Sequence, residues 1–86
     1  MPIFKWSSLK SERLKKTRGV SFEEILTGEL VGFVEHPTRP DQRLILIWYR
    51  NYVWAVPYIE SQNETFLKTL YPSRKYTRMF KEGRFS

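Results

Sequence analysis

Residues 43–59 read RLILIWYRNYVWAVPYI, and this stretch decides the fold. Two apolar runs of strand length, residues 44–49 and 52–59, flank the dipeptide Arg50-Asn51. Asparagine tolerates the positive φ that a two-residue turn between antiparallel strands requires. The stretch therefore predicts a β-hairpin whose turn falls at these two residues.

The predicted hairpin also has a register and two faces. A two-residue turn places Tyr49 opposite Tyr52 and Arg43 opposite Tyr58. Side chains alternate between the faces, and both sets are largely apolar, so we expect these strands to be central in a sheet and covered. Pro57 lies inside the second run and predicts a bulge or an early end of that strand, because proline cannot donate to a ladder.

The chain before the hairpin begins with a predicted strand and helix. Residues 3–6 alternate weakly, as a short strand does. Ser7 or Ser8 is placed to cap a helix that runs through residues 8–17, and Gly19 follows where helices commonly stop.

A second helix and a second strand follow. Ser21 stands three residues before Glu24, which is the spacing of a capping box, and the apolar residues after it predict a two-turn helix that ends at Gly28. Residues 30–36 predict a strand. Its alternation places three side chains on one face: Val31, Phe33 and Glu35.

After the hairpin, residues 65–71 predict a further strand, and residues 74–82 predict a closing helix that Ser73 caps and Gly83 stops. The order predicts a single α+β domain over residues 1–86. It has a short strand, two N-terminal helices, an antiparallel sheet of three to four strands covered on one side, and a closing C-terminal helix.

Composition excludes several classes of site. The 86 residues contain no cysteine and one histidine, so disulfides, zinc–cysteine sites and thiol catalysis are excluded, and we expect neither a metal site nor a cofactor. No apolar run approaches the roughly 18 residues of a membrane span, and the first residues lack the apolar core of a signal peptide. We therefore expect a cytoplasmic protein without a membrane partner.

The net charge of +6 is unevenly distributed. Residues 1–20 and residues 66–86 each carry six basic groups and one acidic group, whereas residues 21–65 carry three basic and seven acidic groups. If the fold brings the two ends together, they form one positive face, which is typical of proteins that bind RNA or another polyanion. The expected face consists of Lys10, Lys15, Lys16, Arg18, Lys68, Arg74, Lys75 and Arg78.

Several motifs carry a family resemblance. Phe4-Lys5-Trp6, Lys10 and Gly19-Val20-Ser21-Phe22-Glu23-Glu24 follow one another with the spacings of the BrnT family of toxins, and the chain resembles that family. Gln42-Arg43 resembles the Glu-Arg start of a family strand, and residues 68–78 resemble the closing strand and basic helix. Arg18 stands where the family has histidine, and Tyr71 stands where it has arginine.

The resemblance implies a RelE-like fold and a function. BrnT-like proteins are the toxin half of a type II toxin–antitoxin system, so the resemblance implies a metal-independent endoribonuclease that cleaves RNA and inhibits translation and growth. It also implies a cognate antitoxin as partner, a small DNA-binding protein encoded next to the toxin. The alternative is a non-catalytic RNA- or protein-binding module of the same fold.

Cleavage of RNA without a metal needs a proton acceptor, a group that stabilises the phosphorane, and a proton donor. Arginine clamps a phosphate in a bidentate manner, so Arg43 and Arg74 are the first candidates, and we expect them to converge on one site with Lys10 and Tyr71 at its rim. His36 titrates in the range that proton transfer requires.

Each candidate also has a structural interpretation. The alternatives are an ion pair of Arg43 with Asp41 or Glu60, loop packing for His36, edge packing for Tyr71, and solvated helix charges for Lys10 and Arg74.

Overall fold

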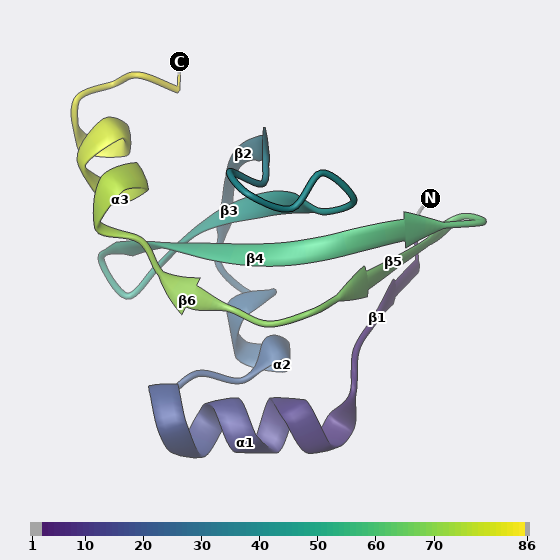
Figure 1. The fold of residues 1–86 in the computed structure, drawn as a ribbon. Helices are drawn as coiled ribbons and strands as arrows, with labels where there is room; N and C mark the ends of the chain where they lie inside the picture. The colour runs from purple at the N-terminus through teal and green to yellow at the C-terminus, as the bar shows by residue number, and fades with distance from the viewer. Residues whose placement is uncertain (1–2, 86) are drawn as a thin grey trace.

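The computed structural model describes residues 3–85, and nine elements follow one another in this range. Figure 1 shows their arrangement. In chain order they are β1 (Ile3–Lys5), α1 (Ser8–Arg18), α2 (Phe22–Ile25), β2 (Glu29–Glu35), β3 (Arg43–Tyr49), β4 (Tyr52–Ser61), β5 (Glu64–Leu67), β6 (Tyr71–Pro72) and α3 (Arg74–Lys81).

One mixed sheet holds all the strands that the structure describes, in the order β1-β5-β4-β3-β2, with β6 also paired to β4. The predicted α+β class is confirmed, but the prediction of a purely antiparallel sheet of three to four strands is wrong. The N-terminal strand β1 adds parallel to β5, and the predicted strand 65–71 is divided into β5 and β6. The sequence pattern within a single strand does not reveal which strand it pairs with, so the parallel pair of β1 and β5 was not predicted.

The central hairpin has the predicted turn and register. Arg50 and Asn51 have φ values of 53° and 61°, and positive φ at both central residues is the geometry whose twist matches antiparallel strands. Tyr49 pairs with Tyr52, and Arg43 pairs with Tyr58.

Pro57 causes neither a bulge nor an early end, so that prediction is wrong. The residue stays in register opposite Leu44, and β4 continues to Ser61. The Pro57 carbonyl accepts a hydrogen bond from the Lys68 backbone N–H at 2.8 Å, away from β3. The proline nitrogen faces the same way, toward the chain between β5 and β6, where no ladder bond is required of it.

The helix ends follow the local signals. Ser7 caps α1, Gly19 ends it with a φ of 78°, and the Ser21–Glu24 capping box is present. The second helix is shorter than predicted, because α2 covers only four residues and Leu26 is its C-cap. In α3, Ser73 is the N-cap.

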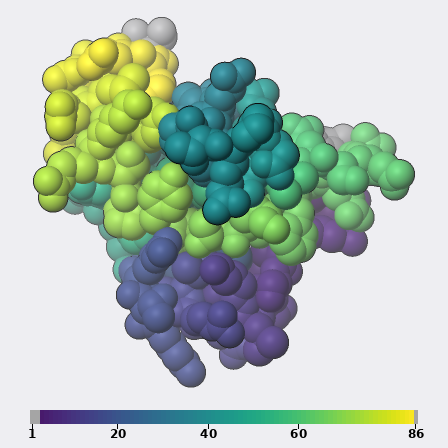
Figure 2. Space-filling model, in the orientation of Figure 1, coloured from purple at the N-terminus to yellow at the C-terminus, as the bar shows by residue number. Residues whose placement is uncertain are grey.

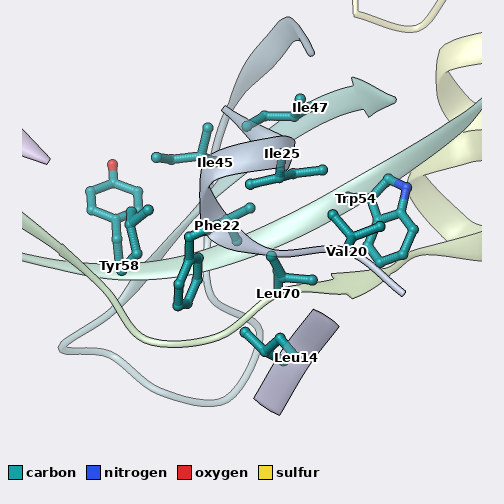
Figure 3. Packing of buried hydrophobic residues seen from close by; sticks show 11 residues of the cluster. Leu14, Val20, Phe22, Ile25, Ile45, Ile47, Trp54, Tyr58 and Leu70 are labelled. Carbon is teal, nitrogen blue, oxygen red and sulfur yellow. The ribbon is translucent and has the colours of Figure 1, made fainter. Parts of the chain in front are cut away.

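Two hydrophobic layers cover the two faces of the sheet (Figure 1). The first lies under α1 and α2 and includes Phe22, Trp54 and Leu70 (Figure 3). The second lies under α3 and is built on Leu46 and Ala55. The prediction that the sheet is covered on one side is therefore wrong, because the closing helix packs on the face opposite the N-terminal helices.

A β-bulge in β2 changes which side chains share a face. Leu30 pairs with Ile47 and Gly32 with Leu46, so Val31 is the extra residue. Val31 consequently packs with Val34 against the layer under α3. Phe33 lies on the other face, where its ring contacts Tyr58. The prediction that Val31, Phe33 and Glu35 share a face is wrong, because one extra residue reverses the alternation.

Gly28 is closely surrounded by β3, and this predicts a loss of stability when a methyl group is added. A Cβ at Gly28 would lie 2.6 Å from Ile47 Cγ2 and 2.8 Å from the Trp48 backbone oxygen. We expect Gly28→Ala to lower the melting temperature by roughly 5–20 °C, since overpacking costs about 1–3 kcal/mol in a domain of this size. Gly32→Ala is the control, because a Cβ there meets open space. Equal melting of the two variants would contradict this interpretation.

Glu23 ties β1, α1 and α2 together. Its carboxylate accepts hydrogen bonds from the Ser11 hydroxyl at 2.5 Å and the Trp6 indole N–H at 3.1 Å, and Ser11 Oγ accepts from the Phe22 N–H. The Ser11 hydroxyl is the largest reason why the pKa of Glu23 lies below its ordinary value of 4.5.

This lowered pKa predicts a pH dependence of stability. A carboxyl with a lower pKa in the folded state stabilises the protein above pH 4.5, and this contribution is lost as the pH falls through the folded-state pKa. We expect Glu23→Gln to melt below the wild type at pH 7, with a difference that shrinks below pH 4.5. Melting curves from pH 7 to pH 3 measure this. Glu12→Gln on exposed α1 is the control, and a constant difference across the range would contradict the prediction.

Candidate functional site

The structure separates the two arginines that were expected to converge. Arg43 pairs with Tyr58 on β4, whereas the residue before Arg74, Ser73, donates its N–H to the Val53 carbonyl. Val53 and Tyr58 are five positions apart on β4, which is about 17 Å. Arg43 also lies on the same face of the sheet as Tyr58, which is the face under α1 and α2, whereas α3 covers the opposite face. The prediction of one site containing both arginines is therefore wrong.

His36 performs the structural role that was its alternative. Its Nδ1 accepts hydrogen bonds from the backbone N–H groups of Thr38 at 3.2 Å and Arg39 at 3.1 Å. The lone pair of Nδ1 is thus occupied, so the proton of the neutral ring is on Nε2. In this arrangement His36 organises the loop between β2 and β3 and offers no free lone pair to a substrate proton.

A second group of predicted residues does come together, around the edge strand β6. Arg18, at the end of α1, donates from its guanidinium to the Leu70 carbonyl, directly before β6. Tyr71 begins β6, and Arg74 and Lys75 begin α3 directly after it. We call these residues, with Tyr76, the β6-edge cluster.

The N-terminus of α3 is held firmly against β4. The Val53 N–H donates to Thr77 Oγ1 at 2.8 Å, and the Thr77 hydroxyl donates to the Ser73 carbonyl at 2.6 Å. Ser73 and Thr77 are both buried. These bonds fix the direction in which Arg74 and Lys75 leave the sheet. Ser73 was predicted as the cap of this helix, whereas the role of Thr77 was missed.

The hydroxyl of Tyr71 has a shifted pKa. Burial raises the pKa of its hydroxyl above 10.0, and the neighbouring Tyr76 raises it further, while the charge of Arg18 acts in the opposite direction. The phenol therefore keeps its proton throughout the neutral range. The partner Tyr76 was missed, and its only sequence signal was its place in the first turn of the capped helix.

Lys75 and Tyr76 form one wall of the cluster. The Lys75 Nζ lies 5.3 Å from the centre of the Tyr76 ring, which is within the range of a cation–π contact. The Tyr76 ring also packs against the ring of Phe85, and the two ring centres are 6.2 Å apart. Tyr76, with Lys75 over its ring, and the Arg18 guanidinium thus lie near the Tyr71 hydroxyl.

The remaining basic residues form a band around the β6 edge instead of one flat face, because α1 and α3 lie on opposite faces of the sheet. Figure 2 shows the chain just before α3 between the purple α1 and the yellow α3. Residues 13–22 and 65–81 supply nine basic side chains and no acidic one. This stretch of surface is suited to a polyanion.

Individual members of the predicted basic set differ in their surroundings. Lys15 is engaged by Glu24 at 2.8 Å, so its charge is compensated. Lys68 lies over the ring of Phe66 at 5.5 Å. Lys10 is half-buried and is two helical turns from Arg18, on the same side of α1. Lys16 and Arg78 are exposed on the two helices.

No family model, no curated protein and no solved structure matches the chain. Within residues 3–85 no three His, Cys, Asp or Glu side chains gather in a group suited to a metal ion. In the same range, no helix is long and apolar enough to cross a membrane.

Proposed function

We propose that the protein is an RNA-cleaving toxin of a type II toxin–antitoxin pair, with its active site at the β6-edge cluster. The observation that carries the proposal is Tyr71, a partly buried phenol with a raised pKa, held between Arg18 and the basic start of α3. A neutral phenol beside cations is suited to donate a proton to the oxygen that leaves when RNA is cut. The structure shares its α+β class with the fold that the BrnT-like resemblance implies.

Each residue of the cluster has a role in this proposal. Arg18, Arg74 and Lys75 bind the phosphate and stabilise the charge that develops on it. Tyr76 holds Lys75 at the site through its cation–π contact. Tyr71 protonates the leaving 5′-oxygen, and a solvent water accepts the proton of the attacking 2′-hydroxyl. Lys10 contributes positive charge along the side of α1.

The alternative is a non-catalytic RNA-binding module. The observation that favours it is the position of Arg43 and His36. Arg43 lies on the face of the sheet opposite Tyr71, and His36 lies near Arg43 in the loop before β3. In this case the cluster binds phosphates and bases without cutting the chain.

The test uses the purified protein and a labelled single-stranded RNA in the presence of a chelator. The toxin proposal predicts cleavage that leaves a 2′,3′-cyclic phosphate, because the ribose 2′-oxygen attacks the phosphorus and the 5′-oxygen leaves. Salt-dependent binding with intact RNA would support the binding module instead. Both the toxin and the binding module should lose RNA affinity between about 50 and 200 mM salt, because each bound phosphate releases counterions.

The antitoxin follows from the same charges. We propose that an acidic, partly disordered segment of the antitoxin covers the β6-edge cluster and becomes ordered on binding. Induced expression with and without the neighbouring gene tests this, with growth and bulk RNA integrity as readouts. Harmless expression of the chain alone would contradict both the antitoxin and the toxin proposals.

A further inference from the structure

A hollow of about 430 Å³ opens on the face of the sheet that carries α1 and α2. All of its lining residues belong to strands. They are Phe4, Phe33, Arg43, Tyr58, Glu60 and Thr65. The hollow therefore lies over strands β1 to β5, away from the β6-edge cluster.

Aromatic rings form its walls. Phe4 is 41% exposed and Phe33 is 50% exposed, which is unusual for side chains of this size. Tyr58 is 4% exposed, and its ring meets that of Phe33 edge-on, with centres 6.2 Å apart. Figure 3 shows the Tyr58 hydroxyl turned away from the other labelled core side chains. Such an arrangement is suited to stacking a flat ring.

Two opposite charges lie at the rim. Arg43 and Glu60 are diagonal neighbours on β3 and β4, a placement that separates side chains by about 7–8 Å at their bases. Neither residue has a salt bridge within the part of the chain that the structure describes. Because the two charges balance, the hollow suits a neutral ligand that carries both hydrogen-bond acceptors and donors, and it does not suit a phosphate.

Guanine has this combination among the RNA bases. Its O6 and N7 accept two hydrogen bonds from one arginine fork, and its N1–H and N2–H₂ groups donate to a carboxylate. Adenine offers no acceptor at position 6 to the arginine. Uracil and cytosine are single rings and provide less area for stacking.

We infer that this hollow binds one unstacked guanine of single-stranded RNA, with Phe4 and Phe33 against the ring and with Arg43 and Glu60 reading its edge. The inference rests on the proposed function in one respect, namely that RNA is the ligand. It gives Arg43 a role in selecting the sequence that is bound, at a distance from the phosphate site.

The test is the binding of four labelled heptanucleotides, UUUGUUU, UUUAUUU, UUUCUUU and UUUUUUU, to the full chain, measured by fluorescence anisotropy. We expect the guanine heptamer to bind about tenfold more tightly than the other three, as one bidentate contact to a base supplies. Glu60→Gln removes the carboxylate acceptor and abolishes this preference. Glu29→Gln, an exposed carboxylate on β2, is the matched control and keeps it.

Amide chemical shifts locate the effect. The guanine heptamer should shift the Phe33 and Tyr58 amides in the wild type. Equal affinity for all four heptamers would overturn the guanine site and leave the proposed function standing. Binding of none of them would overturn both. A guanine preference that persists in Glu60→Gln, with shifts confined to the β6-edge cluster, would also overturn the inference.

Discussion

Replacing Tyr71 by phenylalanine should lower the rate of RNA cleavage by about 10²–10⁴-fold, which is the range that a positioned acid or base contributes. The substitution removes one oxygen and keeps the ring that packs on the layer under α3. A tyrosine with its ordinary pKa is already protonated at neutral pH, and burial raises the pKa of Tyr71 further, so the wild-type phenol carries the proton that it donates. The leaving 5′-oxygen is far more basic than a tyrosinate, so the proton transfer is favourable.

Single-turnover cleavage and RNA affinity are measured side by side for this variant. We expect affinity and melting temperature to stay close to the wild-type values, since binding depends on the cations and not on the hydroxyl. Tyr49→Phe is the matched control, because this tyrosine lies on β3, which does not pair with β6, and it is outside the β6-edge cluster. Cleavage by Tyr71→Phe at the wild-type rate would exclude Tyr71 as the proton donor.

Replacing Arg18 by alanine should lower cleavage by about 10²–10³-fold, the usual cost of one lost contact to the developing charge. Arg18 is fixed by its hydrogen bond to the Leu70 carbonyl, which aims the guanidinium along the β6 edge. Arg18→Lys keeps the charge but loses the planar fork, so we expect it to restore little of the activity.

The same substitution also has a small effect on stability, and the two effects are separable. Loss of the bond to Leu70 costs about 0.5–1.5 kcal/mol, which lowers the melting temperature by several degrees. Assays well below the melting temperature then report on chemistry alone. Arg13→Ala, an exposed arginine on the same helix, makes the same change in net charge and should cleave normally. Equal cleavage by Arg18→Ala and Arg13→Ala would show that only overall charge matters.

The site was only partly predictable. The sequence placed Tyr71, Arg74 and Lys75 near one another, because they are neighbours in the chain. It gave no reason to bring Arg18 beside Tyr71, since that contact depends on α1 docking under the β6 edge. Arg43 was expected to join them, but it lies on the face of the sheet opposite Tyr71, where the balance with Glu60 changes what it can bind.

Local signals in the sequence were sufficient for the hairpin turn at Arg50-Asn51, its register, the serine caps and the glycine stop of α1 at Gly19. Each depends on a few adjacent residues, since a turn or cap is set by the φ and hydrogen-bonding preferences of those residues themselves. Tertiary structure alone decided the parallel pairing of β1 with β5, the bulge at Val31 and the placement of α3 on the face opposite α1. These features join segments far apart in the chain. Their free energy comes from apolar surface buried between such segments, and a local pattern does not specify which distant surface is buried.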